Sequence, residues 1–235
     1  MSSNNSIILL DVKLKEEKTS LEMATLLAKL EYSDEEGIGF RNISNENDQV
    51  IVGEALKKTP IFINLLNPVS QEIEKKEEFV LSEIEFTIDL KYSILEVYSS
   101  HRDLKKLQII FRSLAKDTIS ISQLDFSLSQ LMFALKENAK IVEIRKMCIK
   151  DFQYEPGIIG TYDVTFYNPE NAWLFLNRYQ TGINSVTFYI SNDEWEIMLT
   201  IRANGQIKFN NKSKNAISGC LELLKSLIIK SNYHA

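Results

Sequence analysis

The stretch SVTFYISNDEWEIMLTIRANGQIKF, residues 185–209, decides the fold class of this chain. Apolar residues occupy every second position from Val186 to Ile190 and again from Trp195 to Ile201, and a third short run, 207–209, follows a turn at 203–205. Strands joined by such short turns must be antiparallel neighbours, because a parallel return needs a long crossover. The stretch therefore predicts a three-stranded antiparallel meander.

Strand and helix patterns alternate along the rest of the chain. Apolar residues at every second position predict strands, and apolar residues three and four positions apart predict helices. The expected strands cover 7–14, 84–90, 94–97, 118–126, 141–149 and 162–166, and the expected helices cover 20–30, 100–116, 128–136, 169–176 and a last run that ends near Lys230. We expect an α+β fold, predominantly antiparallel sheet with helices packed on one face, and a small N-terminal α/β lobe.

A charged stretch, QEIEKKEE at 71–78, marks the predicted domain boundary between Asn67 and Ser82. A linker and a solvated helix fit its composition equally well. Before it we expect short strands at 49–52 and 61–66, with a turn of helix at 54–58 between them. Residues 1–80 would then form the small lobe with its charged linker, and residues 81–235 the main α+β domain that ends in the meander and its helix.

The overall composition excludes several classes of protein. The chain has 235 residues, of which 44% are hydrophobic and 25% charged, as in a soluble globular protein with an ample core. Its net charge of −5 argues against nucleic-acid binding by bulk electrostatics. Two cysteines cannot form a disulfide framework or a four-cysteine zinc site, which favours the reducing cytoplasm. We find no signal peptide and no stretch long enough to cross a membrane.

Patterns typical of catalysis are missing. Ser99, Ser100, His101 and Asp103 combine a hydroxyl, an imidazole and a carboxylate, but catalytic triads are assembled from separated segments. Ser100 and Asp103 fit a helix N-cap better. The sequence has no glycine-rich phosphate loop, and its two histidines, at positions 101 and 234, cannot form a histidine-rich metal site. We therefore expect no metal and no cofactor.

The helix expected at 100–116 carries the best binding candidate. Leu104, Leu107, Ile110, Phe111 and Leu114 fall on one side of it at about 100° per residue. The opposite side carries five cations, which are Arg102, Lys105, Lys106, Arg112 and Lys116. Such a face can hold a phosphate backbone or an acidic protein surface. A merely solvated face is the alternative interpretation.

Asp89 and Lys91 are the candidate catalytic pair of a competing hypothesis. Metal-dependent nucleases of the restriction-enzyme type use an acid and a lysine on one side of a strand, together with an upstream acid, because carboxylates hold the metal ion and the lysine orients the water. Glu72, Glu74 or Glu83 could supply that upstream acid. The spacing is permissive, since a chain with 32 acidic and 27 basic residues forms several such triplets by chance.

These observations lead to one expected function and two alternatives. We expect a non-enzymatic binding or assembly subunit that contacts a protein partner or forms a homo-oligomer, and that binds nucleic acid through the basic helix face. Heavy use of isoleucine, lysine and asparagine indicates a bacterial or mobile-element system, of which phage defence is one example. The alternatives are a metal-dependent nuclease and a small-molecule sensor domain.

Overall fold

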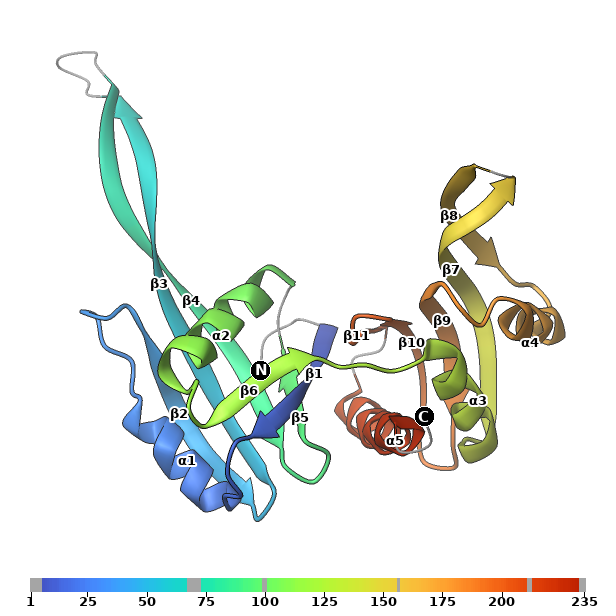
Figure 1. Ribbon diagram of the computed structural model, residues 1–235, viewed down its shortest axis with the longest axis horizontal. Helices are drawn as coiled ribbons and strands as arrows, with labels where there is room; N and C mark the ends of the chain where they lie inside the picture. Colours follow the sequence, from blue (N-terminus) through green and yellow to red (C-terminus); the bar gives the residue numbers. More distant parts are fainter. Residues whose placement is uncertain (1–5, 67–72, 99–100, 156, 211–212, 233–235) are drawn as a thin grey trace. The chain divides into compact units, whose positions relative to one another are not determined.

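The computed structural model describes residues 6–66, 73–98, 101–155, 157–210 and 213–232 (Figure 1). The chain forms two compact units. Val12–Ile121 is called here the N-terminal unit, and Met1–Asp11 together with Ser122–Ala235 the C-terminal unit. The division passes through two strands, β1 (Ser6–Leu14) and β6 (Ile119–Gln123).

Antiparallel sheet dominates both units, which confirms the predicted sheet-rich α+β class. The N-terminal unit contains α1 (Ser20–Lys29), β2 (Ile38–Asn47), β3 (Val50–Leu66), β4 (Ile73–Asp89), β5 (Ile94–Val97) and α2 (His101–Leu114). Its strands lie in the order β2-β3-β4-β5-β1, and β6 also pairs with β1. The pairings of β2 with β3, β3 with β4 and β4 with β5 are all antiparallel.

The core of the N-terminal unit lies between this sheet and its helices. α1 begins with the full capping box, in which Thr19 accepts from the backbone of Glu22 and Glu22 accepts from the backbone of Thr19. The rings of Phe40, Phe86 and Phe111 join β2, β4 and α2, with centroids 5.0–5.9 Å apart. Burial of these rings holds α2 on the sheet.

The C-terminal unit contains the predicted meander. Its elements are α3 (Leu128–Asn138), β7 (Ile141–Glu155), β8 (Ile158–Thr165), α4 (Pro169–Arg178), β9 (Ile183–Ser191), β10 (Glu196–Arg202), β11 (Gln206–Phe209) and α5 (Lys214–Asn232). The strand order is β1-β11-β10-β9-β7-β8. Leu199 of β10 lies opposite Phe188 of β9 and Phe209 of β11, and all three side chains are buried. The predicted meander is therefore confirmed, and α5 packs on its central strand.

Two predictions for the first 80 residues are wrong. The turn of helix at 54–58 is strand, because 49–52 and 61–66 belong to one continuous strand, β3. The charged stretch is neither linker nor helix where the structure describes it, since Ile73–Ser82 is the first part of β4. The pairing runs without interruption from Val50↔Asp89 to Leu66↔Ile73, so the cross-strand ladder overrides the low strand propensity of Glu and Lys. The boundary predicted between Asn67 and Ser82 falls in this hairpin, and part of it, 67–72, lies outside the described residues.

Candidate protein-binding arm and the predicted site residues

The distal part of the β3–β4 hairpin is the most unusual surface of the N-terminal unit. β2 pairs with β3 only as far as Lys57, and β5 pairs with β4 only as far as Phe86. Beyond these points β3 and β4 pair with each other alone among the described strands, and the ribbon projects past the other elements of its unit (Figure 1). We call Lys58–Leu66 and Ile73–Leu81 the arm.

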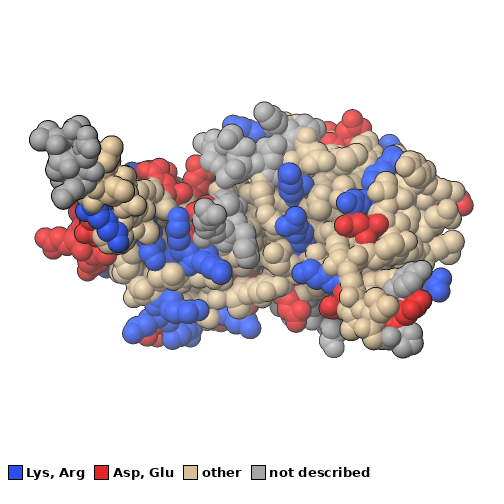
Figure 2. Space-filling view, turned by 90° about the horizontal axis from the view of Figure 1, so that it is seen from above, with Lys and Arg blue, Asp and Glu red and all other residues tan. Residues whose placement is uncertain are grey.

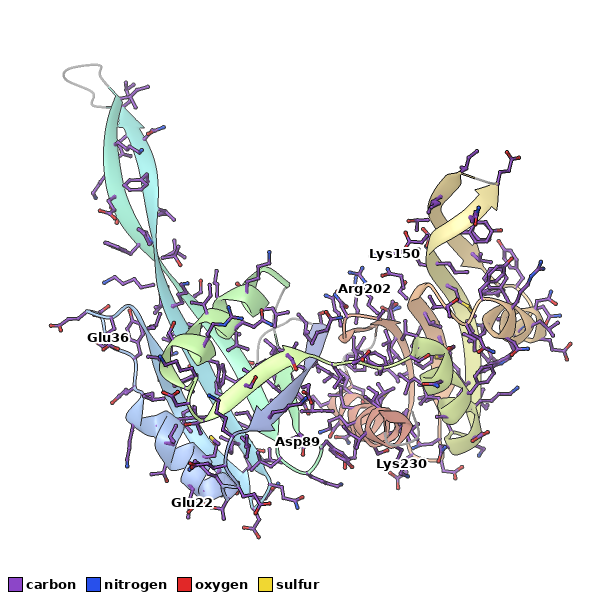
Figure 3. All side chains as sticks on the ribbon, viewed as in Figure 1. Glu22, Glu36, Asp89, Lys150, Arg202 and Lys230 are labelled. Carbon is purple, nitrogen blue, oxygen red and sulfur yellow. The ribbon has the colours of Figure 1, made fainter. Side chains whose placement is uncertain are left out.

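The arm exposes large apolar side chains along its whole length (Figure 3). Nine of them are 37–72% exposed, and they are Ile61, Phe62, Ile63, Leu65, Leu66, Ile73, Phe79, Val80 and Leu81. A single exposed Leu or Ile is ordinary on a protein surface, but a contiguous apolar patch of this kind marks an interaction site. The arm is therefore the candidate functional site of this protein.

The arm has two faces, because successive side chains of a strand point to opposite sides. One face, which we call the Phe62 face, carries Pro60, Phe62, Leu66, Ile73, Phe79 and Leu81 together with Lys58, Asn64, Lys75 and Glu77. The other, the Ile61 face, carries Ile61, Ile63, Leu65 and Val80 with Lys76 and Glu78. Apolar residues thus occur on both faces, unlike a strand pair that covers a core on one side only.

Three lysines of the arm contact its rings or its acids, and Lys58 also forms an ion pair of 3.3 Å with Asp34 outside the arm. Lys75 Nζ lies 4.6 Å from the centroid of the Phe62 ring, and Lys58 Nζ lies 4.8 Å from that of Phe79. Lys76 Nζ forms an ion pair of 2.5 Å with Glu78. Cations over aromatic faces gain about 0.5–1 kcal/mol at exposed sites. These contacts keep an apolar ribbon soluble without covering it.

Four of the five residues of the predicted basic face lie on α2, and Lys116 follows the last residue of the helix, Leu114. Lys105, Arg112 and Lys116 are exposed. Lys106 is engaged within the protein, because its Nζ donates to Ser82 Oγ at 2.7 Å and to Asp103 Oδ1 at 3.2 Å. The side chain of Arg102, like Ser99, Ser100 and the side chain of His101, lies outside the described part of the chain.

Figure 2 shows Lys and Arg side chains at several separate places on the visible face, with Asp and Glu side chains among them. The helical spacing predicted one apolar side for α2, and this side is buried. Its buried residues are Leu104, Leu107, Ile110 and Phe111. Binding of an anionic partner by the opposite side stays a prediction.

Asp89 (Figure 3) is the last residue of β4, and Lys91 lies in the turn that leads to β5. The side chain of Asp89 is only 4% exposed. Its Oδ1 accepts a hydrogen bond of 3.4 Å from the backbone N–H of Tyr92. Lys91 Nζ lies 4.4 Å from the centroid of the Tyr92 ring. Such a carboxylate shapes a turn.

Among the candidate upstream acids that the structure describes, Glu83 is not assembled with Asp89. Glu83 is six positions away on β4, which is about 20 Å along a strand. It forms an ion pair of 3.2 Å with Arg41 instead. Glu72 and the side chain of Glu74 lie outside the described residues. Within the described residues, no group of three or more His, Cys, Asp or Glu side chains could hold a metal ion.

The buried Glu96 of β5 and the half-buried Tyr98 just after the strand form a polar pair with a structural explanation. Tyr98 Oη donates a hydrogen bond of 2.5 Å to Glu96 Oε2, and Thr87 Oγ1 lies 3.5 Å from the same phenol oxygen. Burial, and then the neighbouring Glu96 carboxylate, raises the pKa of Tyr98 well above its ordinary value. The phenol therefore stays protonated at neutral pH and serves as a donor to a carboxylate that is itself buried.

A hollow of about 450 Å³ in the C-terminal unit was not foreseen from the sequence. It lies where β7 bulges between Ile149 and Phe152, beside Lys150 (Figure 3), and Tyr179 lines it from the end of α4. Phe152, Tyr162, Phe175 and Tyr179 form a chain of ring contacts with centroids 4.5–6.2 Å apart. Aromatic residues spread over positions 152–179 were the only sequence signal, and their convergence depends on the β7–β8 pairing.

Sequence signals for the arm were present but were divided by the charged stretch. Apolar residues are concentrated at 61–66 and again at 79–81.

Comparison of the chain with protein-family models and with curated proteins gives no match. No helix among the described residues combines the length and the apolar character that crossing a membrane requires.

Proposed function

We propose that this protein is a non-enzymatic binding and assembly subunit that contacts a partner protein through the arm. The observation that carries the proposal is the set of nine exposed large apolar side chains on a ribbon with no third strand among the described residues. An isolated two-stranded hairpin is marginally stable in water, so a partner that covers the arm would bury apolar surface and order the ribbon at the same time.

Several features of the arm support association without uncontrolled aggregation. Pro60 interrupts the outer edge of β3, because proline has no N–H to donate to an added strand. Lysines at 58, 75 and 76 also discourage edge-to-edge pairing. The expected packing of helices on one face of the sheet is part of this proposal, as are a cytoplasmic location and a bacterial or mobile-element system such as phage defence.

The test uses a double variant in which Phe62 and Phe79 are both replaced by Glu. The partner proteins that copurify with this variant are compared with those that copurify with the parent. Both side chains are exposed, so the double variant should fold like the parent by circular dichroism. A matched control is Leu21→Glu on α1, where the leucine is 65% exposed but lies outside the arm. We expect proteins that copurify with the parent, including further copies of the chain, to be lost from the double variant and kept by the control. Equal recovery by all three proteins would contradict the proposal.

Nucleic-acid binding through α2 is the second part of the expected function. Lys105→Gln with Arg112→Gln should weaken binding of DNA or RNA and flatten its dependence on salt, because fewer counterions are released on association. Stability should barely change, since both side chains are exposed. Lys15→Gln with Lys29→Gln removes the same charge from other exposed positions of this unit and is the control. Equal affinities and salt slopes for all variants would show a merely solvated face.

The two alternative functions can each be tested at named residues. A metal-dependent nuclease would need Asp89 and Lys91, and cleavage that survives Asp89→Ala and Lys91→Ala would exclude this site. A small-molecule sensor would use the hollow beside Phe152 and Tyr179, whose volume is in the range of small-ligand pockets.

A further inference from the structure

We propose that the Phe62 face of the arm packs against the same face of a second copy of this chain, about a twofold axis that crosses β4 near Lys76. The inference rests on the proposed function, because it names the partner that the arm contacts. A twofold interface uses one surface patch twice, so the patch must be complementary to itself.

The charge of the arm fits a copy of itself. Its two segments contain three lysines, at 58, 75 and 76, and three glutamates, at 74, 77 and 78, and carry no net charge. The whole chain has a net charge of −5. A surface that had evolved to meet a strongly basic or acidic partner would carry the opposite sign, whereas a neutral arm can approach its own copy without repulsion.

Lys75 and Glu77 determine how the strands of the two copies run relative to each other. They lie two positions apart on the Phe62 face of β4. Lys75 Nζ lies over the Phe62 ring, and Glu77 has no ion-pair partner among the residues that the structure describes. In an antiparallel arrangement about Lys76, Lys75 of each copy meets Glu77 of the other. Ile73 then meets Phe79, so apolar residues face apolar residues on either side of the two ion pairs.

The apolar area of the face matches what a stable dimer needs. Phe62, Leu66, Ile73, Phe79 and Leu81 are 43–72% exposed, and Pro60 and the stems of Lys58 and Lys75 extend the same surface. Together they offer on the order of 600 Å² per copy, which is the lower end of what each partner contributes to an interface of standard size. Packing face to face also avoids the edge of β3, where Pro60 has no N–H to offer.

The test uses charge reversal in the full chain, with molar mass measured by sedimentation over a range of concentrations. With K75E both positions of the pair are acidic on each copy, and with E77K both are basic. Each single variant should therefore raise the dissociation constant of the dimer by about tenfold or more. An equimolar mixture of K75E and E77K should form mixed dimers as tight as those of the parent, because the two acids of one copy then meet the two lysines of the other.

Two controls separate this inference from the proposed function. The double variant K75E/E77K restores complementarity and should dimerise, whereas Leu21→Glu should dimerise like the parent because Leu21 lies on α1. A parent that stays monomeric at every concentration, or a mixture no tighter than its components, would overturn the second-copy inference. If the monomeric parent still loses a different protein partner on Phe62→Glu and Phe79→Glu, the proposed function stands without it. If no partner depends on the arm, both fail.

Discussion

Leu199→Ala tests the packing of the meander and the assignment of its two faces. Leu199 is fully buried at the centre of β10, between Phe188 and Phe209. The substitution removes three side-chain carbons, which costs about 2.4 kcal/mol at about 0.8 kcal/mol for each buried methylene group. Two flanking phenylalanine rings cannot easily move into the space, so a cavity adds to this cost and the expected total is about 3–5 kcal/mol.

Urea unfolding followed by tryptophan fluorescence measures this loss in the relevant unit. Both tryptophans of the chain, Trp173 and Trp195, belong to the C-terminal unit. Trp195 lies directly against α5, since a Cβ built on Gly219 would be 2.3 Å from its Nε1 atom. The fluorescence change therefore reports on the same sheet and helix that Leu199 helps to hold together.

Met198→Ala is the matched control for the same experiment. Met198 is the preceding residue of β10, points to the opposite face and is 37% exposed. Its truncation should cost less than about 1 kcal/mol, as is usual for surface positions. A Leu199 variant as stable as the parent, or less affected than the Met198 variant, would refute the assignment of faces and with it the packing of α5 on this side.

Three further predictions concern a turn, a glycine and a thiol. Asp89→Ala should destabilise the N-terminal unit by about 1–3 kcal/mol, because the buried carboxylate accepts a hydrogen bond from the backbone N–H of Tyr92. Urea unfolding followed by circular dichroism measures this loss, and unchanged stability would show that Asp89 does not shape the turn. Gly205→Ala should lower the free energy of unfolding by at least about 2 kcal/mol, because Gly205 has a φ of +81° and a Cβ there would lie 2.4 Å from the carbonyl oxygen of Leu9. Gly160→Ala is the control, because a Cβ built on Gly160 has no heavy atom within 4 Å. Burial raises the pKa of Cys220 to about 12, so its thiol stays protonated at pH 8. It should therefore react with a disulfide reagent only after unfolding, and more slowly than the half-buried Cys148. Equal reaction rates of the two thiols would contradict the burial of Cys220 on α5.

The sequence by itself determined the elements with strong periodicity. The alternation from Val186 to Ile201 predicted β9 and β10, and the helical spacing of Leu104, Leu107 and Phe111 predicted the buried side of α2. Thr19 with Glu22 begins α1 as a capping box, which is also a local pattern of the sequence. These features depend on neighbours within a few positions, so the residues that cause them stand together in the sequence.

Strand partners at long range were decided only by the tertiary structure. β1 pairs with β11 through Ser6↔Lys208, and nothing near either residue specifies the other. The stretch at 73–78 is strand because β3 supplies a matching ladder, although its Glu and Lys residues favour helix or loop. For the same reason the basic face of α2 could not be derived in full. Lys105 and Arg112 were visible as charges, whereas the hydrogen bond from Lys106 to Ser82 depends on the tertiary structure.

The arm shows most clearly where local pattern ends and tertiary structure begins. Ile61, Phe62 and Phe79 look like core residues in the sequence, because apolar side chains in strands are usually buried. Their exposure follows from the strand lengths, since β2 stops pairing at Lys57 and β5 at Phe86. β3 and β4, each 17 residues long, go on pairing with each other as far as Leu66 and Ile73. Strand length relative to its neighbours is a property of the whole sheet, and it turns an ordinary apolar pattern into a surface that needs a partner.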